Sequence, residues 1–233
     1  MIRRLTVKWP NSPANPVPSA GVRLLAVSDE REAALGHARN RSAIAPVSVI
    51  VGCGDLEPDY LSFLGDAFHA PLLYVHGNHD RGGAWEAGLQ VAPMPLGGRV
   101  ERAAGVTFGG LGWPSRPDGR AERDEGSAWR QALALYLRAR LRGPQPAVIL
   151  SHVPPRDLGD DPSDPYHTGF AAYRWLCQRL QPVLWLHGHT TLAAARHWRC
   201  QLGRTTLVNV TGAALIELDP TARSLAPGAG RGQ

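Results

Sequence analysis

Short apolar runs alternate with polar, glycine-containing turns along most of the chain. Each run spans a few residues and ends in a turn that carries Asp, Asn, Ser or His. Apolar runs of this length, bounded by glycine or proline, are typical of buried strands. The pattern predicts strands at 22–27, 47–51, 72–75, 147–150 and 183–186.

Helical periodicity occurs between these strands. Three segments are expected to be helices: 59–68, 128–142 and 170–180. The second contains a stripe of large apolar residues at four-residue spacing, which we expect to face the core, with Ser127 as the N-cap. The members of the stripe are Trp129, Leu133, Leu137 and Leu141. Further strands are expected at 99–103, 106–110, 206–210 and 213–218. Strands that alternate with helices indicate an α/β layered fold.

Length and composition favour one folded domain. The chain has 233 residues, of which 43% are hydrophobic, and this is enough to bury a full core. We expect the domain at 22–219, between a proline-rich N-terminal segment at 1–21 and a flexible tail at 220–233.

Charge and cysteine content exclude several classes of protein. The net charge of +5 is spread along the chain and comes almost entirely from arginine, so nucleic acid is not expected as the main partner. No apolar run approaches the roughly 18 residues of a membrane span, and the first residues lack the apolar core of a secretion signal. Three cysteines without a C-x-x-C pair argue against a disulfide framework or a thiolate zinc site. We expect a cytoplasmic protein without a membrane partner, and we leave its oligomeric state open.

The turns that follow the predicted strands hold side chains that bind metal ions. They are Asp29, Asp55, Asn78, His79, Asp80, His152, His187 and His189. In α/β folds the ends of strands are where sites form. Oxygen and imidazole ligands without thiolates favour divalent transition metals such as Mn, Fe, Zn or Ni. Such ions generate hydroxide from bound water and clamp a phosphate ester, and Asp55 on its glycine-flanked turn suits the bridge between two ions.

Five short motifs resemble, in order, those of the calcineurin-like metallophosphoesterases. They are Asp29, Gly54-Asp55, Gly77-Asn78-His79-Asp80, Ser151-His152 and Gly188-His189. The G-N-H-D phrase is the most specific of them, and the resemblance covers about residues 22–218. It implies a two-sheet β-sandwich flanked by helices, in four αββα layers, with a dinuclear metal centre at one edge.

The resemblance also implies roles for individual residues. Asp55 would bridge the two ions, and Asn78, His152 and His189 would complete one metal position. His79 would protonate the leaving oxygen as general acid, oriented by Asp80, with Asn78 beside it in the catalytic motif.

The other metal position departs from the family pattern. Arg31 and Thr191 stand where the family has histidines, which leaves Asp29 and Asp55 alone in that position. We therefore expect one tightly bound ion and a weak or vacant second site.

Three further residues are candidates to replace the lost ligands: Glu30, His187 and His167. Arg31 is either a solvated charge or a partner of Asp29 in place of an ion. The acidic segment 157–169, which contains His167, is either a solvated surface loop or a lid that faces the substrate.

Three functions are compatible with these observations. The leading hypothesis is a metal-dependent phosphomonoesterase or phosphodiesterase, manganese-dependent for example, that acts on a small phosphoester. The alternative is a catalytically degenerate member of the family that serves as a binding or scaffold protein. A nuclease is less favoured, because the arginines do not cluster in the sequence.

Overall fold

The structure of the chain is a computed structural model. It describes residues 2–10, 21–80, 85, 87–88, 94–116, 122–141, 143–192 and 198–221. The segments 11–20 and 222–233, which belong to the expected N-terminal segment and tail, lie outside the described residues.

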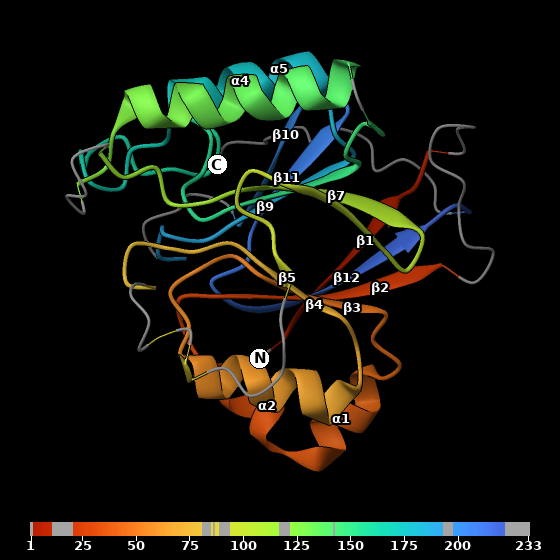
Figure 1. The fold of residues 1–233 in the computed structure, drawn as a ribbon. Coiled ribbons are helices and arrows are strands. Elements are labelled where there is room, and N and C mark those ends of the chain that lie inside the picture. Colours follow the sequence, from red (N-terminus) through yellow and green to blue (C-terminus); the bar gives the residue numbers. More distant parts are fainter. Residues whose placement is uncertain are drawn as a thin grey trace, which may run out of the picture.

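The described residues form two mixed six-stranded sheets that pack face to face (Figure 1). The first sheet has the order β1 (Arg3–Lys8), β12 (Gly212–Asp219), β2 (Val22–Ser28), β3 (Val49–Gly52), β4 (Leu72–Tyr74) and β5 (Met94–Pro95). The second has the order β10 (Arg199–Leu202), β11 (Thr205–Asn209), β9 (Leu184–His187), β8 (Val148–Ser151), β7 (Val106–Leu111) and β6 (Val100–Ala103).

Helices cover the outer face of each sheet. The first sheet is covered by a 3-10 turn, η1 (Ala33–Gly36), and by α1 (Ala38–Ile44) and α2 (Pro58–Phe68). The second is covered by α4 (Glu125–Leu141) and α5 (Ala171–Leu180). The order of layers is helix, sheet, sheet, helix, which confirms the predicted α/β sandwich. No helix within the described ranges is long and apolar enough to cross a membrane.

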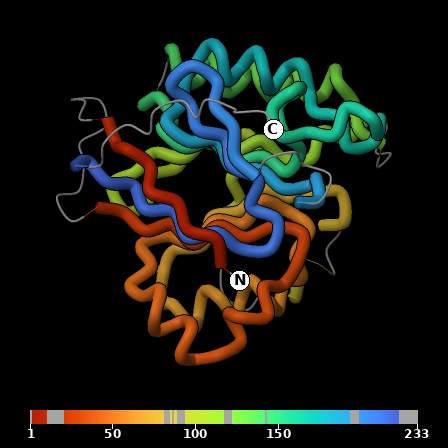
Figure 2. The backbone as a smooth tube through the Cα atoms, turned by 180° about the vertical axis from the view of Figure 1, so that it is seen from behind, coloured from red at the N-terminus to blue at the C-terminus, as the bar shows by residue number. Residues whose placement is uncertain are grey.

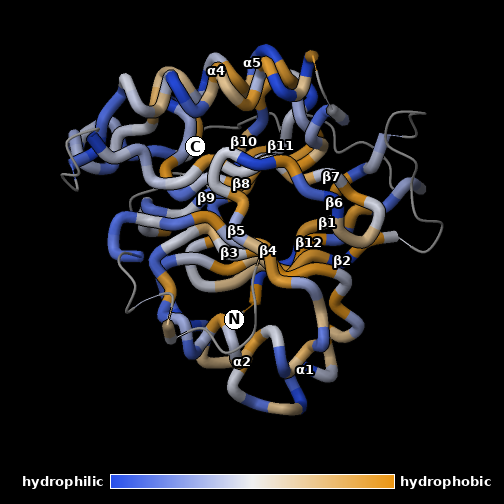
Figure 3. The backbone as a smooth tube through the Cα atoms, in the orientation of Figure 1, coloured by the Kyte–Doolittle hydropathy of each residue, from blue (hydrophilic) through white to orange (hydrophobic). Residues whose placement is uncertain are grey.

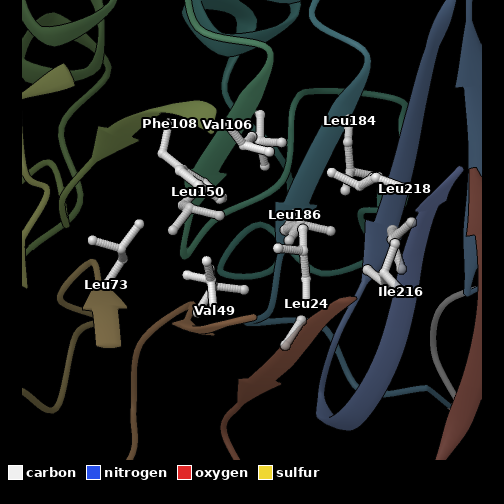
Figure 4. Close-up of a cluster of buried hydrophobic side chains, with 14 of the residues drawn as sticks. Leu24, Val49, Leu73, Val106, Phe108, Leu150, Leu184, Leu186, Ile216 and Leu218 are labelled. Atoms are coloured by element: carbon white, nitrogen blue, oxygen red, sulfur yellow. The ribbon is translucent and has the colours of Figure 1, made fainter. Parts of the chain in front are cut away.

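The main core lies between the two sheets. Leu24, Val49 and Leu73 project from the first sheet toward Phe108 and Leu150 of the second (Figure 4). Apolar residues are concentrated on the strands of this interior, and polar residues on the turns at its edges (Figure 3). Because both faces of each central strand are covered, these strands are nearly continuous apolar runs.

Parallel pairing brings together the turns that carry the candidate ligands. Strand β2 pairs in parallel with β3, and β3 with β4; in the second sheet β8 pairs in parallel with β9. The turns after parallel strands lie at one edge of a sheet, and here they face each other across the sandwich.

The beginning of the chain requires a correction. The domain was expected to begin at residue 22, but β1 extends the first sheet by pairing in parallel with β12, which Figure 2 shows from behind. Trp9 is 1% exposed and belongs to the core. Arg3 donates hydrogen bonds to the carbonyl groups of Asn209 and Thr211. Residues 3–9 are therefore part of the domain; alternation along this short edge strand was masked by the prolines that follow it.

Helix α4 also differs from expectation. It begins at Glu125, and Asp124 rather than Ser127 caps it, because the Asp124 carboxylate accepts a hydrogen bond from the Ser127 amide at 2.7 Å. Three of the four residues of the predicted stripe face outward: Leu133, Leu137 and Leu141 are 42%, 51% and 73% exposed. Trp129, the fourth, is partly buried and packs against the core beside Trp175. The buried face of the helix consists of Ala128, Ala132, Leu135 and Ala139. Small side chains on this face let α4 lie close to α5 and the sheet, which four-residue periodicity alone did not reveal.

The two faces of α4 should respond differently to truncation. We expect Leu135→Ala to lower the free energy of unfolding by about 2–5 kcal/mol, because it removes buried methyl groups and leaves a cavity. Leu137→Ala is the matched control, with an expected change within about 0.5 kcal/mol. Urea unfolding followed by circular dichroism measures both. Equal losses would contradict the observed orientation of the helix.

Candidate metal centre

Asp55 occupies a tight turn at the end of β3. Both Gly54 and Asp55 have left-handed backbone conformations, with φ of 95° and 56°. A Cβ atom at Gly54 would lie 2.6 Å from His152 Nδ1 and 2.7 Å from the Gly77 amide nitrogen. Only glycine fits this contact, so the three turns approach each other as closely as backbone permits.

His152 is the centre of the site. It is fully buried, and its Nδ1 atom donates a hydrogen bond to the Cys53 carbonyl at 2.8 Å. In the neutral ring this bond leaves the lone pair on Nε2, and that atom faces the other turns. Three atoms surround Nε2: Asn78 Oδ1 at 3.0 Å, Asp55 Oδ2 at 3.2 Å and His189 Nδ1 at 3.2 Å. Four ligand-type atoms from four turns therefore converge on one point.

The electrostatics of these groups suit a cation. Burial opposes a charge on His152, but hydrogen bonding to Asp55 and the charges of Asp29 and Asp55 outweigh it and raise the pKa of His152. The pKa of Asp55 is lowered: burial acts against its charge, and the bond with His152 more than offsets it. Burial and the neighbouring His152 lower the pKa of His189 to about 3. A divalent ion would take the place of the proton that His152 and Asp55 share, because ligating imidazole is neutral and ligating carboxylate is ionised.

Asp29 lies beside this point. Both of its carboxylate oxygens accept from the His189 amide at 3.1 Å, and Oδ2 accepts from the Thr211 hydroxyl at 3.2 Å. A Cβ at Gly188 would lie 2.3 Å from Asp29 Oδ2, so the glycine of the last motif makes room for this carboxylate. Within the described part of the chain, Asp29, Asp55 and His152 offer ligand atoms within 4.8 Å of one another. Carboxylate oxygen together with imidazole nitrogen fits a divalent transition metal.

Asp80 links two of the turns. Its Oδ2 atom accepts hydrogen bonds from the Gly77 amide at 2.8 Å and from the Asp55 amide at 2.6 Å. The side chain is buried, and this burial raises its pKa. These hydrogen bonds of the Asp80 carboxylate go to backbone amides, so it fixes the position of Asp55 and of the turn that carries His79.

His79 lies at the opening of the site. Its side chain is 81% exposed, with Nε2 4.0 Å from Asp55 Oδ2. Its backbone amide donates to Asp55 Oδ1 at 2.8 Å. The ring is therefore close to the candidate bridging carboxylate, and it is exposed to solvent.

Arg31 is turned away from the candidate ligands. Its guanidinium donates to Glu57 at 3.0 Å and to Asp59 at 2.7 Å, and these hydrogen bonds raise its pKa. The alternative in which Arg31 pairs with Asp29 is not what the structure shows; the acidic residues at the start of α2 hold it instead.

Three residues were considered as replacement ligands for the altered position. His187 is fully buried, its Nε2 is 2.9 Å from where Gly159 would carry a Cβ, and burial lowers its pKa to about 4. It is a core histidine under the loop. Glu30 and His167 line the pocket over the site, but neither joins the described group formed by Asp29, Asp55 and His152.

The segment 157–169 forms one wall of the pocket, which has a volume of about 490 Å³. Tyr166, His167 and Trp85 are among the residues that line it. His167 Nδ1 is 2.5 Å from Asp164 Oδ2, and its ring centre is 5.0 Å from that of His189. Two residues of the segment therefore face the pocket, and a role for the segment as a lid over a substrate stays a prediction. The aromatic character of the wall was not anticipated, although Tyr166 beside His167 was the available signal.

Trp113 packs beside His152 and His189. Its ring centre is 5.5 Å from that of His189 and 6.0 Å from that of His152. Because Trp113 is buried, it supports the orientation of these rings rather than a substrate.

Comparison with known proteins agrees with this geometry. The family model "Calcineurin-like phosphoesterase" matches residues 45–191. No curated protein matches the chain significantly. Among solved structures, the protein TT1561 of Thermus thermophilus is similar with a TM-score of 0.56 and 17% identity, over 82% of this chain and 90% of that chain. A second similar structure is GAP50, described as the anchor in the inner membrane complex of Plasmodium, with a TM-score of 0.51 and 13% identity, over 82% and 71%. At these identities the two structures establish a shared fold.

Proposed function

The chain belongs to the calcineurin-like phosphoesterase family, and we propose that it is a metal-dependent hydrolase of small phosphomonoesters or phosphodiesters. One observation carries the proposal: Asn78, Asp55 and His189 place ligand atoms within 3.2 Å of the Nε2 atom of buried His152. A structural histidine needs one partner, whereas this one faces three ligand-type atoms beside an open pocket.

Asp55, Asn78, His152 and His189 would hold one ion tightly. Asp29 and Asp55 would hold a second one weakly, because Arg31 and Thr191 supply no ligand at that position and Arg31 pairs with Glu57 and Asp59 instead. Mn, Fe, Zn and Ni suit this set of ligands. Such an ion supplies Lewis acidity to a phosphoryl oxygen and to the attacking water.

His79 is the proposed general acid. Its exposed ring at the pocket opening can approach the leaving oxygen of a bound ester, and proton donation of this kind contributes about 10²–10⁴-fold in rate. Asp80 would support His79 through the turn, because its carboxylate fixes the amides of Gly77 and Asp55.

The substitutions at Arg31 and Thr191 favour a second candidate, a degenerate family member that binds without catalysis. Intact Asn78, His79 and Asp80 argue against it, because a scaffold does not need an acid and a carboxylate that fixes its turn. The experiments below distinguish the two.

Metal content is the first test of the proposed centre. Protein purified without added ions and then dialysed is expected to contain about one equivalent of transition metal per chain, measured by elemental analysis. The physical reason is that only one position keeps a complete set of ligands. Two equivalents that resist a chelator would show that another side chain completes the second position.

Asp55→Asn tests catalysis against scaffolding. The amide keeps the shape of the carboxylate but loses its charge, so both ion affinity and turnover should fall while the fold is retained. The wild type should hydrolyse at least one activated phosphoester in the presence of Mn²⁺ or Ni²⁺, and the variant should lose about 100-fold or more of this activity. Asp66→Asn on the exposed side of α2 is the control and should behave as wild type. A wild type that is inert with every ion and ester would favour the scaffold.

His79→Ala tests the general acid. Substrates with poor leaving groups should lose about 10²–10⁴-fold in kcat, because their departing oxygen needs a proton. An aryl phosphate with an activated leaving group should lose much less. Steady-state kinetics on the two kinds of ester give the comparison, and equal losses would assign His79 to binding.

A further inference from the structure

The orientation of His189 is set by one hydrogen bond from outside the ligand cluster. Its Nε2 atom is 3.0 Å from the Tyr166 carbonyl oxygen, and its Nδ1 atom is 3.2 Å from His152 Nε2. A carbonyl oxygen only accepts hydrogen bonds, so Nε2 carries the proton. The lone pair of Nδ1 therefore faces the point where the candidate ligands converge.

The Tyr166 carbonyl is itself held in place by Arg123. The Arg123 guanidinium donates to the carbonyl oxygens of Pro165, at 3.0 Å, Tyr166 and Thr168. It also lies 4.5 Å from the centre of the Phe170 ring. Arg123 comes from the segment that precedes α4, far from the loop in sequence, and it joins three carbonyl groups that would otherwise repel one another.

We propose that Arg123 is a positioning residue of the metal centre. It fixes the Tyr166 carbonyl, and that carbonyl selects the His189 tautomer in which Nδ1 is the ligand atom. The proposal rests on the metal-binding role of His189 proposed above, and it extends that role to a residue that no motif of the family contains. A planar guanidinium with several donors can serve three carbonyls at once, which the compact ammonium group of lysine does less well.

The same loop provides a matched control. Arg174, on α5, donates to the Arg156 carbonyl and to the Asp157 carboxylate, both at 2.9 Å. It therefore anchors the beginning of the loop, whereas Arg123 anchors the end that contacts His189. Loss of either arginine removes a charge and loop contacts, but only Arg123 reaches the Tyr166 carbonyl.

The experiment compares Arg123→Gln with Arg174→Gln in metal-free protein. Circular dichroism and urea unfolding first establish that both variants are folded. Long-range ¹H–¹⁵N NMR of the imidazole rings, with His189 assigned by its loss in His189→Asn, then gives the tautomer. Titration with Ni²⁺ by calorimetry gives the affinity.

We expect the wild type and Arg174→Gln to have the Nε2–H tautomer at His189 and Ni²⁺ dissociation constants within about twofold of each other. Arg123→Gln should show a mixture of tautomers and bind Ni²⁺ about 10–100-fold more weakly, as is typical when a group that orients a metal ligand is removed. The Ni²⁺ dissociation constant of Arg123→Lys should lie between those of the wild type and Arg123→Gln. Arg123→Lys also provides a second variant should Arg123→Gln not fold.

Equal effects of the two glutamine variants, or an unchanged tautomer in Arg123→Gln, would overturn the proposal. The outcome is separate from that of the proposed function. A wild type that binds Ni²⁺ without hydrolysing any ester would contradict the hydrolase but leave the role of Arg123 supported if the variants differ as expected. If the wild type binds no Ni²⁺, the tautomer in the metal-free protein decides the proposal alone.

Discussion

The hydrogen bond from His152 Nδ1 to the Cys53 carbonyl is the contact on which the site depends. His152 follows a strand of the second sheet, and Cys53 follows a strand of the first. The bond therefore crosses the sandwich, fixes the tautomer of the ring and aims Nε2 at the other candidate ligands. It forms only when the two sheets pack at their native separation. The geometry of the site therefore depends on the packing of the core.

Backbone conformation reflects the same constraint. Asp29, Asp55 and His189 have φ values of 60°, 56° and 67°. Left-handed conformations cost non-glycine residues roughly 1–2 kcal/mol each, and at functional sites they persist because the surrounding contacts determine them. Here the turns contact one another closely because Gly54, Gly77 and Gly188 have no side chains; a Cβ atom at any of the three would clash with a neighbouring turn. The glycines and the candidate ligands in left-handed conformations therefore depend on each other.

Two arginines from distant segments donate hydrogen bonds to backbone carbonyl groups near Asp29 and His189. Arg3 donates to the carbonyls of Asn209 and Thr211, next to the hydroxyl that holds Asp29. Arg123 does the same for the loop over His189. Both guanidinium groups are partly buried, which lowers their pKa values, yet they stay charged at neutral pH and join carbonyl groups of different residues. These two arginines therefore have structural roles that the composition alone did not indicate.

The layered fold and the turns that carry the candidate ligands could be predicted from the amino-acid sequence alone, because apolar runs and glycine-containing turns are local features. The grouping of Asp55, Asn78 and His189 with His152 was predicted from the resemblance to the family motifs. Tertiary structure decided the features that depend on partners far along the chain. The Arg31 guanidinium pairs with Glu57 and Asp59 at the start of α2 instead of with Asp29. The Asp80 carboxylate accepts hydrogen bonds from two backbone amides. Close packing against α5 decides which face of α4 is buried. Strand β1 joins the first sheet because it pairs with the edge of β12. No local pattern encodes these choices, since each one depends on which distant group arrives within hydrogen-bonding or packing distance.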